Sequence, residues 1–193
     1  MIDYITGTVT ELNPAFAVVE CNGIGYGINI SLNTFSALEK DTSCRILIHE
    51  AIREDAHLLY GFATADERDL FRQLITVSGV GAGTARMMLS SVTPSDLREA
   101  IISGNVAILK GVKGIGLKTA QRIIVDLKDK IGKHAVSGEI LAFSDNTARE
   151  EALSALVMLG FARSSVSKVI DNILRENKKL QVEEIVRKAL KLL

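Results

Sequence analysis

Two short glycine turns are the residues of this sequence best suited to bind a ligand. They are Gly79-Val80-Gly81 and Gly114-Ile115-Gly116. Glycine allows positive φ angles and lets another backbone approach without a Cβ in the way. A helix is predicted to start just after the second turn, at about Leu117, and the amides of a helix's first turn favour an anion such as phosphate. The pattern therefore predicts phosphate binding by backbone amides.

The two turns belong to an internal repeat with a constant offset of 35 residues. Besides the glycines, four residues of each copy match: Leu74, Val77, Thr84 and Ala85 against Leu109, Val112, Thr119 and Ala120. A repeat is much harder to explain by chance than a single match. Each copy resembles the helix-hairpin-helix motif, whose amides grip a nucleic-acid backbone without reading its sequence. The candidate DNA-binding residues are Gly79, Val80, Gly81, Ala82, Gly83, Thr84, Arg86, Lys113, Gly114, Ile115, Gly116, Leu117, Lys118, Thr119 and Arg122.

Three other interpretations compete with this one. A single Gly-x-Gly is about as often only a tight turn between helices. A dinucleotide fingerprint needs a third glycine, but Thr84 and Thr119 occupy its place. A Walker loop comes closer, yet Leu117 stands between Gly116 and Lys118 as one residue too many, and residues 105–110 are predicted to be helix rather than strand. The sequence therefore predicts no ATP site.

No arrangement of side chains predicts catalysis. His49, His57 and His134 are scattered, with no cysteine or carboxylate at ligand spacing, so no metal site is expected. No Ser/His/Asp set or pair of carboxylates stands out, and we expect neither a cofactor nor enzymatic activity from this chain alone. Cys21 and Cys44 suit a reduced, cytoplasmic protein. No signal peptide is predicted, and no apolar run approaches the roughly 18 residues that cross a bilayer.

The charge balance changes along the chain, although Lys+Arg and Asp+Glu are equal at 23 each. Residues 1–63 carry 3 Lys+Arg against 8 Asp+Glu, residues 64–133 carry 11 against 7, and residues 134–193 carry 9 against 8. The basic excess lies in the block that contains both glycine turns, as a phosphate-binding surface requires.

An N-terminal β domain is predicted over residues 1–63. Its strands are expected at 2–12, 16–21, 24–30, 44–52 and 57–62, with a helical turn at 35–38. Asn22-Gly23 is typical of a two-residue hairpin turn, and Gly7 indicates a bend or bulge in the first strand. Five strands in about sixty residues favour a small closed barrel of the oligonucleotide/oligosaccharide-binding (OB) type.

Residues 64–133 are predicted to be helical and to hold both glycine turns. Asp66 and Glu67 suit the start of a helix, because acidic side chains favour its first turn. Thr93-Pro94 opens another helix, with proline at the first helical position. Gly132 is expected to end the helix that begins at about Leu117.

A linker and a last helical module complete the predicted multi-domain α+β chain. Apolar periodicity disappears over residues 134–146, which favours a flexible linker. Thr147 and Glu150 have the spacing of a capping box at the start of residues 147–193, and Gly160 is expected to end that helix. Two further apolar repeats predict helices around residues 166–174 and 182–193. A three-helix module of this size buries little area and is typical of a partner-docking domain.

Taken in order, these segments resemble the bacterial RuvA family, the Holliday-junction-binding subunits of a branch-migration machine. The resemblance rests on the two hairpins, on Gly23-Ile24-Gly25-Tyr26, and on the segment from Arg53 to Phe62. It extends over the whole chain, from an OB-fold barrel through a tandem helix-hairpin-helix domain to a three-helix, UBA-like module. It implies a part in DNA recombination, DNA repair and the SOS response to DNA damage.

The resemblance also implies partners and further sites. The family holds four-way junction DNA open and roughly square as a homotetramer, or as two stacked tetramers that make an octamer. It recruits the hexameric RuvB ATPase, and the RuvC junction resolvase is a further expected partner. By themselves Glu54 and Asp55 are ordinary solvated turn residues, but they occupy the positions of the family's acidic pin. For the contact with RuvB we expect Leu156, Leu159 and Phe161.

The hairpins depart from the family pattern in their cations. Family members often carry lysine just after the second glycine or one residue beyond. Here the first hairpin has Ala82-Gly83, and the second has Leu117 before Lys118. This predicts greater reliance on backbone amides and on Arg86, Lys113 and Arg122. Two rival interpretations are a protein-assembly scaffold whose hairpins pack against protein, and an accessory subunit that binds duplex DNA whatever its structure.

Overall fold

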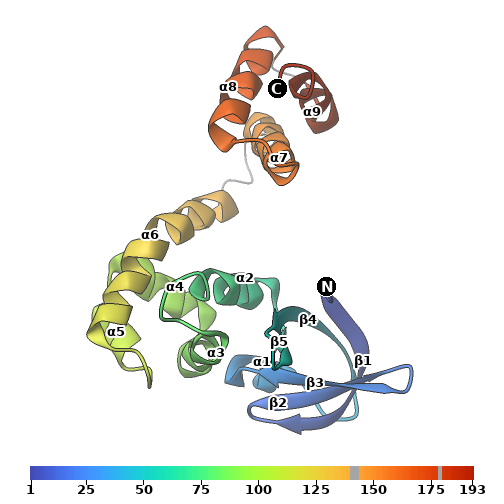
Figure 1. Cartoon of the computed structure of the whole chain (residues 1–193), viewed down its shortest axis with the longest axis vertical. Coiled ribbons are helices and arrows are strands. Elements are labelled where there is room, and N and C mark those ends of the chain that lie inside the picture. Colours follow the sequence, from blue (N-terminus) through green and yellow to red (C-terminus); the bar gives the residue numbers. More distant parts are fainter. Residues whose placement is uncertain (140–143, 178–179) are drawn as a thin grey trace. The chain divides into compact units, whose positions relative to one another are not determined.

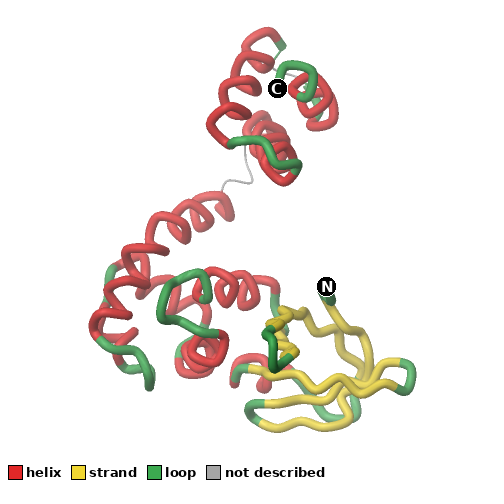
Figure 2. The backbone as a smooth tube through the Cα atoms, viewed as in Figure 1, coloured by secondary structure: helices red, strands yellow, loops and turns green. Residues whose placement is uncertain are grey.

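The structure is a computed structural model that describes residues 1–139, 144–177 and 180–193 (Figure 1). The chain divides into two compact units, Met1–His134 and Ala135–Leu193. The first unit holds a β-barrel followed by helices, and the second is helical (Figure 2). The predicted fold class, a five-stranded barrel before a helical region and a last helical module, is confirmed.

Five strands close the N-terminal barrel. They are β1 (Tyr4–Asn13), β2 (Phe16–Cys21), β3 (Ile24–Ile30), β4 (Ser43–Ile52) and β5 (His57–Phe62), joined in the order β1-β2-β3-β5-β4. β3 and β5 pair in parallel, and the other pairs are antiparallel. The short helix α1 (Leu32–Ala37) follows β3. Alternate side chains point inward, so the barrel core consists of apolar residues such as Val9, Val19, Ile28, Ile46 and Ile48.

Two backbone details of the barrel test the predicted turns. Asn22 and Gly23 have φ angles of 51° and 79°, as a two-residue hairpin turn requires. The irregularity in β1 lies between Val9 and Glu11, where the register with β2 shifts, and not at Gly7 as expected. A Cβ on Gly7 would lie 2.1 Å from the carbonyl oxygen of Glu20, so Gly7 is required because two strands approach closely.

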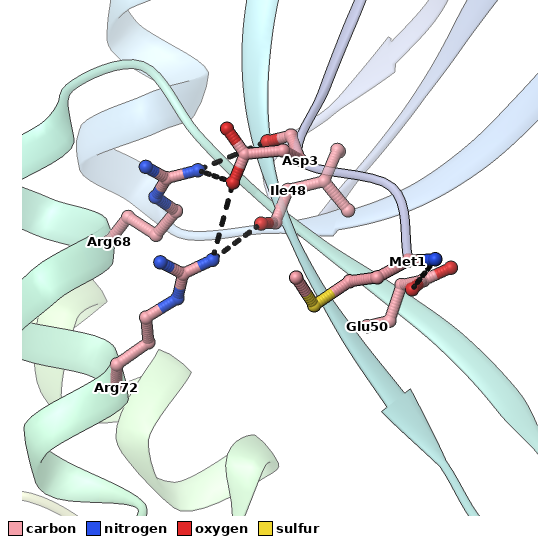
Figure 3. Close-up of polar contacts among 6 residues, drawn as sticks. All are labelled: Met1, Asp3, Ile48, Glu50, Arg68 and Arg72. Carbon is pink, nitrogen blue, oxygen red and sulfur yellow. Dashed lines mark hydrogen bonds and ion pairs between the residues drawn. The ribbon is translucent and has the colours of Figure 1, made fainter. Parts of the chain in front are cut away.

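The start of the chain is fastened to α2 (Ala65–Leu74), the first helix after the barrel. Arg68 Nη1 donates to Asp3 Oδ1 at 2.8 Å and to the Asp3 carbonyl oxygen at 3.1 Å (Figure 3). Arg72 lies one turn further along α2, and its Nη2 reaches the same carboxylate at 3.6 Å. It also donates to the carbonyl oxygen of Ile48 on β4 at 3.4 Å. These contacts hold α2 against β4 and against the residue that precedes β1.

Four more helices follow α2: α3 (Ala82–Ser91), α4 (Pro94–Ser103), α5 (Val106–Lys110) and α6 (Leu117–Glu139). Their buried side chains form one core with Tyr60 and Phe62 from the end of β5. The ring of Phe71 on α2 lies 4.8 Å from that of Phe62 and 5.2 Å from that of Tyr60, centroid to centroid. The helical region is therefore packed on the end of the barrel by shared aromatic contacts.

Two helix boundaries differ from the prediction. α6 continues through Gly132 to Glu139, because an interior glycine costs only about 1 kcal/mol relative to alanine and does not by itself end a helix. α7 (Ser144–Met158) has already begun at Ser144, so Thr147 lies inside a helix and does not cap it. Residues 140–143 of the predicted linker lie outside the described residues.

The second unit contains α7, α8 (Arg163–Glu176) and α9 (Val182–Ala189). Gly160 has a φ of 98° and donates to the carbonyl oxygen of Val157, and Phe161 donates to that of Leu156. These bonds end α7 where predicted, in a left-handed C-terminal turn. The three helices enclose a core of their own that includes Leu153, Leu156, Val166, Ile170 and Ile185.

Candidate nucleic-acid interface

The two glycine turns, called hairpin 1 (residues 79–84) and hairpin 2 (residues 114–119), have the same backbone geometry. Gly79 and Gly114 have φ angles of +91° and +93°, a conformation that strains other residues. Three hydrogen bonds recur at the offset of 35: Val77 N to Leu74 O, Val80 N to Val77 O and Ala85 N to Gly81 O match Val112 N to Leu109 O, Ile115 N to Val112 O and Ala120 N to Gly116 O. The repeat in sequence is therefore a repeat in structure.

Both hairpins lead into a helix directly after a glycine, which has no side chain that could cap the helix. Elsewhere in the first unit, Ser31, Thr64, Thr93 and Asn105 cap α1, α2, α4 and α5 by accepting hydrogen bonds from first-turn amides. α3 begins after Gly81 and has no side-chain cap, and α6 begins after Gly116. The first amides of a helix have no acceptor within it. Those of α3 and α6 are therefore open to an external anion.

The backbone of both hairpins faces open space. A Cβ built on Gly81, Gly83 or Gly116 would meet no atom within 4 Å, and none of the three has a positive φ. Nothing in the described part of the chain therefore requires glycine at these positions. A ligand that approaches the backbone closely would require it.

Three residues predicted to bind DNA have buried side chains. Val80 is 4% exposed, Ala82 8% and Ile115 5%. Val80 and Ile115 anchor the two hairpins in the helical core, so they can offer a ligand only their backbone. Thr84 and Thr119 are half-buried, and Leu117 is exposed.

The predicted cations fall into two groups. Lys113, Lys118 and Arg122 surround hairpin 2 and are exposed, and Arg122 lies 3.7 Å from Asp126 one turn along α6. Arg86 is half-buried, and its guanidinium group donates hydrogen bonds to the barrel. The sequence could not reveal this, because the barrel groups that Arg86 contacts lie far away in the chain.

The acidic turn, Glu54 and Asp55, lies between β4 and β5. Both residues are exposed, and the turn is closed by a hydrogen bond from Arg53 N to the carbonyl oxygen of Ala56 at 2.8 Å. The turn therefore carries two adjacent, exposed carboxylates.

Sequence reasoning missed a buried carboxyl group at the joint between barrel and helices. Glu67 on α2 is 2% exposed. It accepts hydrogen bonds from Ser31 Oγ and, at 2.7 Å, from Thr34 Oγ1. Thr34 in turn accepts from the Ala63 amide at 3.1 Å. Burial raises the pKa of Glu67, although these hydrogen bonds act in the opposite direction. The only signal in the sequence was an acidic first turn, which indicated a helix start and not burial.

We expect the stability of the protein to depend on pH through Glu67. The folded protein keeps a proton on Glu67 at pH values where the unfolded chain has lost it, so the free energy of unfolding should fall as pH rises through that interval. Glu67→Gln removes this titration. The free energy of unfolding of the Glu67→Gln variant, minus that of the wild type, should therefore increase as pH rises. Above the pKa of Glu67 in the folded protein, this difference should stay constant.

Urea unfolding at a series of pH values measures this difference. Glu99→Gln, an exposed carboxyl on α4, controls for the loss of one negative charge. A difference that decreased with rising pH would mean that folding lowers the pKa of Glu67, contrary to this expectation.

The predicted docking residues of the second unit do not share one surface. Leu156 is fully buried and belongs to the core, so its side chain is not available to a partner. Leu159 is 61% exposed, and its neighbour Met158, which was not predicted, is 85% exposed. Phe161 is half-buried. The end of α7 and the turn after it therefore offer the exposed side chains of Met158 and Leu159, whereas Phe161 in the same turn is only partly accessible.

Among the residues that the structure describes, no group of three or more His, Cys, Asp or Glu side chains is arranged to hold a metal ion. None of the helices in the described ranges is both long and apolar enough to span a bilayer. Cys21 and Cys44 are free thiols, and burial raises the pKa of Cys44.

Three family models match successive parts of this chain. Residues 1–61 match the RuvA N terminal domain, residues 71–129 match a SAM-like helix-hairpin-helix tandem, and residues 147–193 match the RuvA C-terminal domain. The fold and the site therefore define a class of DNA-binding protein. Its members have a β-barrel, a tandem pair of helix-hairpin-helix motifs and a separate helical domain.

Similar proteins cover the chain from end to end. A protein of Bacteroides fragilis strain YCH46 is 51% identical over 99% of both chains, and one of Porphyromonas gingivalis is 50% identical over 100% of both. A protein of Flavobacterium psychrophilum is 45% identical over 99% of both. Each is named Holliday junction branch migration complex subunit RuvA. The chain belongs to the RuvA family.

Proposed function

We propose that this protein binds four-way DNA junctions through their backbone phosphates and holds them open for branch migration in DNA recombination and repair. The observation that carries the proposal is the pair of helix N-termini that directly follow Gly81 and Gly116, two glycines with open space around them. Amides bind any phosphate whatever the base, so the protein recognises the backbone and its geometry rather than a sequence. The names of the related proteins support the same conclusion.

Competition between a four-way junction and a linear duplex of the same sequence tests this function. The labelled junction is bound first, and unlabelled DNA of each kind is added in a gel-shift assay. We expect the junction to compete far better than the duplex. Equal competition would favour the accessory subunit that binds any duplex, and no binding at all would favour the protein-assembly scaffold.

The proposal assigns a part to each segment of the chain. Residues 1–63 form the barrel domain, residues 64–133 grip DNA, residues 134–146 are a flexible linker, and residues 147–193 dock the motor. Four copies, or eight in two stacked tetramers, surround the junction. The hexameric RuvB ATPase hydrolyses ATP, the RuvC resolvase acts on the same complex, and this chain is a non-catalytic subunit. Such a complex acts in the cytoplasm, where bacterial DNA lies.

Within an assembly around the junction, the acidic turn acts by repulsion. Symmetry would bring the copies of Glu54 and Asp55 together where the DNA strands cross. At about 6 Å and an effective dielectric constant near 20, each carboxylate–phosphate pair repels by roughly 3 kcal/mol before screening, and salt reduces this severalfold. The carboxylates therefore disfavour strands that lie across the centre and help to keep it open.

The double substitution Glu54→Gln and Asp55→Asn should leave junction binding equal or tighter, because it removes repulsion. It should also reduce the preference for junction over linear duplex and alter the rate of branch migration with RuvB. Dissociation constants for both DNAs, and a branch-migration assay, measure these effects. Glu39→Gln with Asp41→Asn removes the same charge from another exposed part of the barrel and should change neither. Much weaker junction binding by a folded Glu54/Asp55 variant would mean that these carboxylates have a structural role.

A further inference from the structure

The two hairpins have the same backbone geometry but differ in the charge of their side chains. At the offset of 35, the three cations around hairpin 2, Lys113, Lys118 and Arg122, match Ser78, Gly83 and Met87 of the first copy. Hairpin 1 therefore carries a neutral residue at each position where hairpin 2 carries a cation. The one cation near hairpin 1 is Arg86, whose counterpart in the second copy is Gln121.

Arg86 is bound to the barrel. Its Nη1 donates to the carbonyl oxygen of Ala15, in the turn between β1 and β2, at 2.8 Å, and to Asn29 Oδ1 on β3 at 3.2 Å. Asn29 is fixed in turn, because its Nδ2 donates to the carbonyl oxygen of Leu59 on β5 at 3.2 Å. The Asn29 side chain thus links Arg86 to the place where the parallel pair β3 and β5 closes the barrel.

The C-terminal end of α3 is held by a second set of contacts. Asn33 Nδ2 on α1 donates to the carbonyl oxygens of Leu89 and, at 3.3 Å, of Val92. The Leu32 amide donates to Ser90 Oγ at 3.1 Å. α3 is therefore attached to the barrel near its middle by Arg86 and to α1 at its end by Asn33, and hairpin 1 leads directly into this helix.

We propose that the two hairpins bind DNA phosphates in different ways, and that Arg86 is a positioning residue and not a phosphate ligand. This inference rests on the proposed DNA binding. Hairpin 2 binds phosphate through amides and through Lys113 and Lys118, so it supplies the salt-dependent part of the affinity. Hairpin 1 binds through amides alone. Arg86 sets the place of hairpin 1 on the barrel, and thereby its place relative to the acidic turn of that barrel.

The salt dependence of binding separates a positioning residue from a phosphate ligand. Each phosphate neutralised by a cation contributes about 0.9 to the slope of log K against log salt concentration. Dissociation constants for one junction are measured at a series of salt concentrations for the full-length wild type, Arg86→Ala, Lys118→Ala and Asn29→Ala. Lys118→Ala should make the slope shallower by about 0.9 for each phosphate that the lysine neutralises in the wild type. Arg86→Ala should weaken binding roughly tenfold, as expected when hydrogen bonds from a charged donor are removed, with the slope unchanged.

The Asn29→Ala variant keeps the arginine and removes its barrel partner. If Arg86 positions hairpin 1, Asn29→Ala weakens junction binding in the same way. The Arg86→Ala/Asn29→Ala double variant then binds only slightly more weakly than either single variant, because the two residues act together. Tighter binding by Asn29→Ala, a shallower slope for Arg86→Ala, or unchanged affinity for Arg86→Ala would each overturn the inference. Circular dichroism confirms folding of each variant. A wild type that binds neither junction nor duplex would refute the proposed function itself, whereas the slopes bear only on this inference.

Discussion

Replacing Gly81 and Gly116 together with valine will lower the affinity for junction DNA by at least about 100-fold, while the protein stays folded. Each valine places three carbon atoms in the open space in front of a helix N-terminus, where a phosphate must approach. Hydrogen bonds to a charged group contribute about 1.5–3 kcal/mol each, so the loss of one per hairpin already accounts for this effect. The fold should tolerate the change, because neither position has a positive φ or a close neighbour.

A matched control for these valines exists outside the hairpins. Ala162 precedes α8, whose N-terminus also has no side-chain cap, and it is exposed. Ala162→Val adds bulk at a comparable helix start and should leave junction binding unchanged. Affinity is measured by fluorescence anisotropy, and thermal unfolding checks the fold. If the folded Gly81/Gly116 variant bound junctions as tightly as the wild type, the amides of α3 and α6 would not be the phosphate ligands.

Deleting residues 147–193 will leave junction binding intact and abolish stimulation of RuvB-driven branch migration. The deleted helices enclose their own hydrophobic core, separate from the cores of the barrel and the hairpin region. Their loss should therefore not unfold the rest. Binding is measured by gel shift and coupling by a branch-migration assay with the motor present. Full stimulation by the truncated protein would refute the assignment of this module to motor docking.

Two point substitutions locate the docking surface within this module. Leu159 and Leu192 are similarly exposed, at 61% and 65%, but only Leu159 lies on the turn between α7 and α8. Leu159→Asp should reduce stimulation of the motor severalfold, and Leu192→Asp serves as the control for a charge on an exposed leucine. Equal loss in both would mean that the docking surface is not confined to that turn.

The sequence predicted features whose causes are local. The Asn22-Gly23 turn, the helix that opens at Thr93-Pro94 and the end of α7 at Gly160 each follow from a few adjacent residues, and the structure has all three. The hairpins were predictable because the same local pattern occurs twice. Their shared hydrogen bonds join residues no more than four positions apart.

What the sequence did not predict depends on distant contacts. Arg86 meets partners 71 and 57 positions away in the chain, and Glu67 is buried by Ser31 and Thr34 across the joint between barrel and helices. A cation near a glycine turn and an acid in a first helical turn each have a common local explanation. Neither local explanation reveals the distant partners that tertiary packing supplies. The burial of Leu156 was missed for a related reason, because an apolar side chain next to a turn fits a core as well as a surface.

The closed strand order of the barrel limits how copies of this domain can associate. An open sheet ends in strands with unpaired amides and carbonyls, which invite pairing with another chain. Here β4 returns to pair with β1, so the barrel presents no such edge. If several copies of this domain gather around one DNA molecule, as proposed above, neighbouring barrels cannot exchange or add strands. Contacts between them must then be made by side chains.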